Sequence, residues 1–489
     1  MASFAFYLGA NALFAQAVLA FNCSIPPIYV DIHKRAVHDS PAFQYGSFIG
    51  LGTPAQNQSL WPSLSQNHTS FSSNTFCDNS TLKDCDRSTG GFYVKEDSST
   101  FKPKGKDFQP LDKQNDSSRG LFASETVRLY THYFETDGAS QTLLEDVDIE
   151  VVVNSSTTPS IVGIGQASTI LQGLVAQNKI AARTYSLYIG QGFDRAGGSV
   201  NGSNAFGGYD SGRFTGQAHS FSMNTANRNP FSVTVKDIII TETGNPNSNT
   251  SLFDAKKFPS AKQPSAFTAQ ITTDQYPLSL PYQITQNFIK HLDATKDNYW
   301  GDNSLKLRSQ FNGTLSIVIA GDNGDFTVTL PQEVLVNASN ITPIQDRTEA
   351  SSAPFLLSTA FLSQVYLMAD FETFKFYLAE AVQKNNIVMP ETFCPKAVPS
   401  AYERPKQGAW MKQGLIGAVI GGVLGGIGIA ICAYCFVLGC QRRRAEKRVE
   451  RAIEKSKQSK MAQFEVEEVQ SFDPPPKASK VLFWKRGKK

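Results

Sequence analysis

Residues 414–440 run for 27 positions without a charged side chain, and this stretch constrains the fold of the chain more than any other feature. As a helix it would extend for about 40 Å, which exceeds the roughly 30 Å hydrocarbon core of a bilayer. Basic residues follow it at once, beginning with Arg442, Arg443 and Arg444. The positive-inside rule keeps such a cluster in the cytosol. The sequence therefore predicts one C-terminal transmembrane helix, with the preceding residues outside and the tail in the cytosol.

The net charge of +3 comes from this tail. Residues 441–489 hold fifteen basic against seven acidic side chains, which leaves a net charge of −5 on the rest of the chain. A basic total would otherwise favour nucleic-acid binding, but here the body of the protein is mildly acidic. We therefore expect no nucleic-acid partner.

The first twenty residues have the composition of a secretory signal peptide. They contain no charged side chain, are mostly apolar, and end with small residues at Val18 and Ala20. They also lack the usual basic residue, so an uncleaved N-terminal anchor is the alternative. The apolar stretch is short for a membrane helix, which favours cleavage.

Glycosylation motifs of the form Asn-x-Ser/Thr occur only before the apolar segment. This distribution agrees with a secreted, glycosylated ectodomain, although some matches arise by chance in a chain rich in Asn, Ser and Thr. The candidate sites are Asn22, Asn57, Asn67, Asn79, Asn115, Asn154, Asn201, Asn249, Asn312, Asn337 and Asn340.

Four of the seven cysteines precede the apolar segment and would meet an oxidising compartment. Four cysteines permit three pairings. We favour Cys77 with Cys85, which leaves Cys23 with Cys394 to join the two ends of the ectodomain.

The apolar segment carries two further features with open interpretations. Its glycines recur at four-residue spacing, from Gly417 to Gly421 and Gly425, which permits close self-association of two helices. A glycine-rich span without a partner is equally compatible. Cys432, Cys435 and Cys440 are either palmitoylation sites or inert thiols.

The ectodomain reads as an all-β fold, because short β-branched runs alternate with Gly, Asn, Ser, Thr and Pro clusters. Only two segments, 167–181 and 282–292, have the spacing of short helices. The clearest strands are VDIEVVV (147–153), SVTVKDIIIT (232–241), TLSIVIAG (314–321) and DFTVTL (325–330).

Three segments, taken in order, resemble the pepsin-like family of aspartic peptidases. The first-lobe strand and turn of that family are similar to YGSFIGLGTPAQNQSLW (45–61), and its Gly-ended strand with the following helix is similar to SIVGIGQASTILQGLVAQNKIAARTYSLYI (160–189). Its closing block is similar to PFLLSTAFLSQVYLMADFETFKFYLAEA (354–381). The resemblance, closest to fungal members, implies two β lobes that face each other across a cleft.

The same resemblance implies two catalytic aspartates, one from each lobe, which share a proton and activate a water molecule. Aligning residues 51–71 with the first lobe places Ser63 at the first catalytic position. Counting back from Leu280 and Pro281 places Thr272 at the second. Asp274 lies two residues on, about 7 Å along an extended strand, with no carboxylate opposite. Hydroxyl groups cannot replace carboxylate bases, so we expect no catalytic residue.

Other chemistry finds little support in the sequence. A literal Asp-Ser-Gly at Asp210 follows two glycines and a tyrosine, which is typical of a surface turn. Residues 108–122 occupy the place of the family's substrate-covering flap but lack its Tyr-Gly pair. Lys34 and Arg35 are either a dibasic processing site or an exposed loop pair. The histidines have no metal-ligand spacing, and Gly163-Ile-Gly165 lacks the third glycine of a dinucleotide loop. We expect neither a metal nor a cofactor.

Seven segments follow from these assignments: a signal peptide (1–20), an N-terminal extension (21–39), two lobes (40–222 and 223–390), a stalk (391–413), the transmembrane helix (414–440) and a basic tail (441–489). We expect a plasma-membrane protein with a catalytically silent pepsin-like ectodomain that binds a peptide, protein or wall polymer. An active surface aspartic endopeptidase and a receptor that signals through its tail are the alternatives.

Overall fold

The computed structural model describes residues 21–40, 43–80, 82, 84–108, 119–130, 141–191, 200–244, 249–260, 262–299, 303–384, 387–403 and 409–465. The chain divides into two compact units, Met1–Tyr402 and Glu403–Lys489. The predicted signal peptide, Asn115 and most of the segment at the flap position lie outside the described residues.

The larger unit has two halves, the first from β1 to β12 and the second from β13 to β24. The first half is built mainly from strands. Its strands are β1 (Ile28–Ala36), β2 (Phe43–Leu51), β3 (Gln56–Ser63), β4 (Thr69–Ser72), β5 (Lys102–Phe108), β6 (Arg119–Tyr130), β7 (Gln141–Asn154), β8 (Ile161–Gly163), β9 (Thr184–Tyr188), β10 (Gly202–Phe206), β11 (Gly208–Asp210) and β12 (Phe214–Ser222). Its helices are short: η1 (Phe76–Asn79), α1 (Cys85–Ser88), η2 (Lys95–Asp97), α2 (Thr169–Ala176) and η3 (Ser211–Arg213).

The second half of this unit is also rich in strands. They are β13 (Ser232–Glu242), β14 (Thr250–Ser251), β15 (Phe267–Ile271), β16 (Ala294–Asp297), β17 (Ser304–Leu307), β18 (Gly313–Gly321), β19 (Gly324–Leu330), β20 (Ile341–Gln345), β21 (Leu356–Leu357), β22 (Val365–Asp370), β23 (Lys375–Ala381) and β24 (Pro390–Thr392). The helices are α3 (Tyr282–Leu292), α4 (Gln332–Leu335) and α5 (Thr359–Leu362). The predicted all-β fold is confirmed for this unit.

The predicted elements agree closely with the observed ones. The four clearest predicted strands fall within β7, β13, β18 and β19, and the helix predicted at 282–292 is α3. Strand β13 alternates buried and exposed residues, because one face of its sheet packs on the core and the other meets solvent. Helix α3 buries Ile284 and Phe288, which are four residues apart and so lie on one face of the helix.

Thirteen strands form the largest sheet, in the order β12-β23-β22-β9-β10-β1-β2-β3-β8-β4-β7-β6-β5. A further pairing of β2 with β6 closes the six strands from β2 to β6 into a barrel. Strand β1 lies inside this sheet between β10 and β2, and Lys34 and Arg35 pair with Tyr45 and Gln44. The expectation that this dibasic pair lies in an exposed loop is wrong, because backbone hydrogen bonds hold it in a strand. Its use as a processing site stays a prediction.

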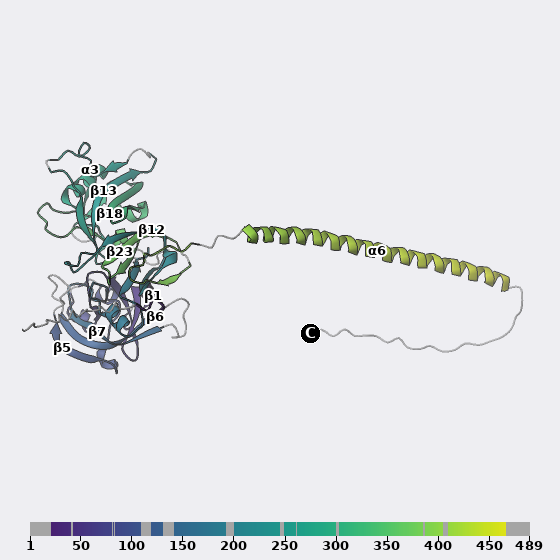
Figure 1. Ribbon diagram of the computed structural model, residues 1–489, viewed down its shortest axis with the longest axis horizontal. Helices are drawn as coiled ribbons and strands as arrows, with labels where there is room; N and C mark the ends of the chain where they lie inside the picture. Colours follow the sequence, from purple (N-terminus) through teal and green to yellow (C-terminus); the bar gives the residue numbers. More distant parts are fainter. Residues whose placement is uncertain are drawn as a thin grey trace, which may run out of the picture. The chain divides into compact units, whose positions relative to one another are not determined.

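The second half forms its own six-stranded sheet, β19-β18-β13-β15-β21 with β14 at the side, and a three-stranded sheet, β16-β17-β20. Figure 1 shows α3, β13 and β18 at one end of the unit and β5 to β7 at the other, with β12 and β23 between them. Two strands from the second half join the large sheet: β22 pairs with β9, and β23 pairs with β12. Backbone hydrogen bonds therefore connect the two halves.

Aromatic residues fill the core where the two halves join. Phe376 stacks on Phe221 at 5.1 Å between ring centroids and meets Phe231 edge to face at 5.3 Å. All three side chains are buried. Phe221 lies on β12, Phe376 lies on β23 and Phe231 directly precedes β13. Burial of the three rings therefore stabilises the packing of these strands against one another.

The smaller unit contains α6 (Ala409–Glu465), an uninterrupted helix of 57 residues (Figure 1). Its part from Ile416 to Ser459 is the one described helix that is long and apolar enough to cross a membrane. It includes most of the predicted transmembrane segment. The free thiols of Cys432 and Cys435 are exposed on it.

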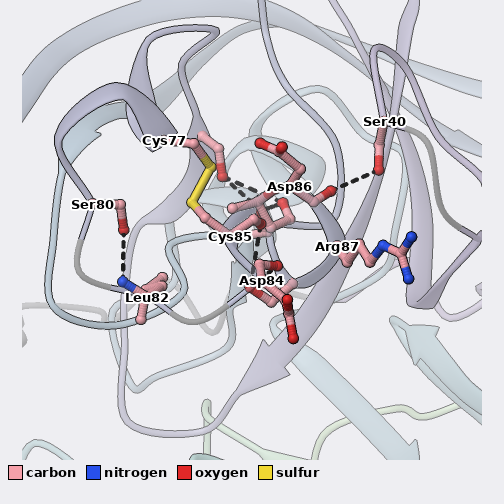
Figure 2. Close-up of a disulfide and its surroundings, with 12 residues drawn as sticks. Ser40, Cys77, Ser80, Leu82, Asp84, Cys85, Asp86 and Arg87 are labelled. Carbon is pink, nitrogen blue, oxygen red and sulfur yellow. Dashed lines mark hydrogen bonds between the residues drawn. A yellow bond between two sulfur atoms is a disulfide. The ribbon is translucent and has the colours of Figure 1, made fainter.

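Two disulfides occur in the larger unit, and their pairing is the one that the sequence analysis favoured. Cys77 bonds Cys85, with 5.8 Å between the Cα atoms, and Cys23 bonds Cys394, with 5.7 Å. Figure 2 shows the first bridge at the start of α1, where the Ser40 hydroxyl donates to the Asp86 carbonyl at 3.0 Å. The second bridge spans 371 positions of sequence.

The long-range bridge gives a stability prediction. Replacing its cysteines in a Cys23→Ser/Cys394→Ser variant should lower the free energy of unfolding by about 2–5 kcal/mol, because the unfolded chain gains the entropy of a very large opened loop. Guanidinium titration of the detergent-solubilised full chain measures this change. Cys432→Ser, which removes a free thiol, is the control, and an equal midpoint for both variants would contradict the prediction.

Candidate functional site

The candidate site lies where one loop from each half of the larger unit meets the other. Strand β3 ends at Ser63 beside the parallel strand β8, and the Ile164 N–H donates to the Ser63 carbonyl at 2.9 Å. Strand β15 ends at Ile271 beside the parallel strand β21, and the Thr272 N–H donates to the Leu357 carbonyl at 2.9 Å. The two loops of the site therefore have the same setting: one follows β3, which pairs with the parallel strand β8, and the other follows β15, which pairs with the parallel strand β21.

The glycines of Gly163-Ile-Gly165 permit the first loop to pack closely. A Cβ on Gly163 would lie 2.4 Å from the His68 carbonyl oxygen, and one on Gly165 would lie 2.5 Å from Asn67 Oδ1. Both distances are too short for a side chain. These contacts support the structural interpretation of the motif, since the glycines accommodate backbone rather than a dinucleotide.

Hydrogen bonds join the two loops directly. The Leu64 N–H donates to Thr273 Oγ1 at 3.3 Å, and the Trp61 indole Nε1–H donates to the Thr273 carbonyl at 2.8 Å. Thr273 is only 1% exposed, so both bonds are shielded from water. The second residue of one loop therefore faces the second residue of the other.

Asp274 lies at the meeting point, and three hydroxyl groups donate to its carboxylate. Ser63 Oγ donates to Oδ1 at 2.6 Å, Ser65 Oγ donates to Oδ2 at 2.5 Å, and Thr272 Oγ1 donates to Oδ2 at 3.2 Å. Ser63 and Thr272 are buried, whereas Asp274 is exposed. Side chains from both halves thus surround one accessible carboxylate.

The expectation that Asp274 continues an extended strand is wrong. Strand β15 ends three residues earlier, and the Asp274 N–H donates to Thr272 Oγ1 at 3.1 Å in a local side-chain turn. Threonine and aspartate favour such turns because their short side chains bond to nearby backbone groups. The turn directs the carboxylate back toward Ser63 instead of further along the chain.

The arrangement contains one carboxylate where an aspartic peptidase needs two. Among the described residues, no second carboxylate and no cationic side chain bonds to Asp274. A lone carboxylate has no partner with which to share a proton. The described groups at the junction can accept hydrogen bonds and attract a positive charge.

Sequence reasoning aligned Ser65 with the family's catalytic loop but gave it no role, and it did not single out Trp61 or Thr273. The signal for Ser65 and Thr273 was position, because Ser65 and Asp274 are both third in their loops, and Leu64 and Thr273 are both second. Comparing the two loops residue by residue would have found the contacts between them.

The literal Asp-Ser-Gly motif lies elsewhere. Asp210 is fully buried, and its Oδ1 accepts the Gly212 N–H at 3.0 Å and the Met389 N–H at 2.7 Å. The Arg213 guanidinium lies 3.8 Å from Oδ2. Asp210 therefore caps a turn and ties it to the segment before β24, out of reach of a substrate. The predicted turn is present, but its expected position at the surface is wrong, because Ser211, Gly212 and Arg213 are buried as well.

Asp31 on strand β1 is a second carboxyl on which the Arg213 charge acts. Burial raises the pKa of the Asp31 carboxyl from its ordinary 3.8 to about 6, against the opposing effects of the Arg35 charge, a Tyr29 hydrogen bond and the Arg213 charge. The folded protein thus binds a proton at Asp31 more readily than the unfolded chain does.

The candidate glycosylation sites differ in exposure. Exposed asparagines are Asn22, Asn154, Asn201, Asn249 and Asn312, and partly buried ones are Asn57, Asn67, Asn337 and Asn340. Asn79 ends η1. The serine or threonine of some motifs is buried, as for Ser59 after Asn57 and Thr69 after Asn67. Those motifs are the poorer candidates.

Comparison with known proteins identifies a family. The family model described as "Eukaryotic aspartyl protease" matches residues 44–381, which is more than half of the chain. No curated protein matches the chain. The matched range includes both loops of the candidate site.

The Thr273 contact gives a prediction. Thr273→Val keeps the side-chain shape but leaves the buried Leu64 N–H without its acceptor, which should lower the free energy of unfolding by about 1–3 kcal/mol. Thermal unfolding of the full chain measures the loss. Thr215→Val, at an exposed position of β12, should change stability by no more than about 0.5 kcal/mol. Equal effects of the two substitutions would contradict the role of this bond.

The Asp31 environment gives a pH prediction. The pKa of Asp31 is higher in the folded state than in the unfolded chain, so its protonation stabilises the folded protein at low pH. This contribution to the free energy of unfolding is lost as pH rises from about 4 to about 6, and it amounts to at most about 3 kcal/mol. Asp31→Asn should flatten this slope in denaturant titrations at successive pH values. Asp39→Asn, at an exposed carboxyl, should keep the wild-type slope. If the pH dependence of stability is unchanged in Asp31→Asn, other titratable groups cause it.

Proposed function

Since the chain belongs to the eukaryotic aspartyl protease family, we propose that it is a membrane-anchored, catalytically inactive member whose ectodomain binds a ligand in its cleft. The ligand would be a peptide, a partner protein or a wall polymer. The observation that carries this proposal is the single carboxylate at the junction of the two loops, surrounded by hydroxyl groups from Ser63, Ser65 and Thr272.

The contact between Leu64 and Thr273 supports the assignment of positions. It sets the second residues of the two loops opposite each other, so the first residues, Ser63 and Thr272, correspond to each other as well. These are the positions where the family carries its aspartates. The proposal therefore assigns Ser63 and Thr272 to the two lost catalytic positions.

The chemistry of these groups supports inactivity. A serine or threonine hydroxyl does not ionise near neutral or acid pH, so neither can take the proton of an attacking water. The hydrogen bonds from the hydroxyls to Asp274 also occupy the side chains that face the junction. The junction of the two loops is then a polar surface, formed by hydroxyl groups and one carboxylate, that is suited to binding a ligand.

The membrane placement follows from α6. We propose that its apolar part crosses the plasma membrane once and that Arg442 to Lys460 lie in the cytosol, consistent with the positive-inside rule. The larger unit would then face the cell exterior, where its disulfides persist and its asparagines meet the glycosylation machinery.

Two alternatives have an observation in their favour. Asp274 lies at the junction with its carboxylate exposed, which is the one feature that favours an active surface endopeptidase. Helix α6 continues well past the apolar stretch as a charged helix, which favours a receptor that transmits a signal to its tail.

A cleavage assay tests the proposal. The full-length protein in detergent is incubated with an unfolded protein substrate at acid pH, and products are detected by mass spectrometry. Wild type and Asp274→Asn should show the same background, and a transition-state-analogue inhibitor of aspartic peptidases should change neither. Cleavage that the inhibitor blocks and that Asp274→Asn removes would establish the active endopeptidase instead.

A further inference from the structure

We propose that the junction of the two loops recognises a primary ammonium group, from a lysine side chain or a peptide N-terminus, through Asp274. This inference rests on the proposed binding function and names the chemistry that the site selects. It depends on three features of the described residues: the exposure of the carboxylate, the absence of a paired cation, and the distribution of hydrogen bonds over its two oxygens.

The charge of Asp274 is uncompensated. The three groups that bond to it are neutral hydroxyls, and no cation among the described residues pairs with it. Elsewhere in the same unit, surface aspartates such as Asp325 and Asp146 pair with lysines at 2.7 Å and 2.6 Å. Asp274 therefore accepts three hydrogen bonds from neutral groups but has no positive charge beside it among the described residues. A cationic ligand would supply that charge.

The hydrogen-bond count distinguishes among cations. Each carboxylate oxygen has two lone pairs. Oδ2 already accepts from Ser65 and Thr272, whereas Oδ1 accepts only from Ser63 and has one lone pair left. An arginine fork needs a free position on both oxygens for its two parallel bonds. A single ammonium donor needs only one, so the site favours lysine or an N-terminus over arginine.

Both halves of the unit hold the acceptor in place. Ser63 and Ser65 come from the first half, while Thr272 comes from the second, so the carboxylate is fixed at the junction rather than free to rotate. Fixing the acceptor before binding reduces the entropy that the ligand interaction must offset. A neutral sugar hydroxyl would gain a hydrogen bond here but would leave the charge uncompensated.

Matched peptides test the inference on the full-length protein in detergent. The probes are fluorescent seven-residue peptides with blocked ends, alanine throughout except at the centre, which is lysine, Nε-acetyl-lysine, arginine or glutamate. Binding is followed by fluorescence anisotropy at low salt. The lysine peptide should bind at least about tenfold more tightly than its acetylated form, and more tightly than the arginine peptide.

Variants assign the preference to the site. Asp274→Asn keeps the size of the side chain but removes its charge, and it should abolish the preference for lysine over acetyl-lysine. Asp39→Asn removes an exposed charge elsewhere and should leave it intact. The comparison of the lysine and acetyl-lysine peptides uses the wild-type protein alone. If Asp274→Asn fails to fold, equal binding of these two peptides would still overturn the inference.

Each outcome decides one claim. A lysine preference that Asp274→Asn abolishes supports the inference. Equal binding of the lysine and acetyl-lysine peptides, no binding of any peptide, or a preference that survives Asp274→Asn would overturn it. Mass spectrometry of the same samples keeps the two proposals separate, because cleaved peptides would overturn catalytic inactivity, whereas intact peptides without a lysine preference would overturn only the ammonium site.

Discussion

The pairing of β9 with β22 is the constraint on which the rest of the larger unit depends. It joins a strand of the first half to a strand near the end of the second, and β23 extends the same sheet to β12. Because the halves share one hydrogen-bonded sheet, the ends of β3 and β15 meet in a defined geometry. The site at their junction is thus a product of long-range pairing rather than of any local motif.

This arrangement also determines which groups hold the two loops together. Two of the bonds between the halves involve the Leu64 N–H, the Trp61 indole, and the carbonyl and hydroxyl of Thr273. Two more run from the Ser63 and Ser65 hydroxyls to the Asp274 carboxylate. None of them requires an aspartate at position 63 or 272. The junction of the two loops is thus held without an aspartate at either position, so the fold by itself does not establish an activity.

Local signals in the sequence predicted much of the fold. The β-branched alternation of residues 232–241 and the four-residue spacing of residues 282–292 are properties of single segments, and β13 and α3 follow them closely. The orientation of Asp274 could not be predicted in this way. It depends on a turn with Thr272 and on hydroxyls of Ser63 and Ser65 from the other half, which become neighbours only after folding.

The bridge between Cys23 and Cys394 closes almost the whole chain of the larger unit into a covalent ring. A single proteolytic cut between these two residues opens the ring, yet both fragments stay attached to the segment that leads into α6. Shedding from the membrane then requires either a cut after Cys394 or reduction of the disulfide. A larger unit with one such cut would remain covalently attached to α6, and only electrophoresis under reducing conditions would show the break.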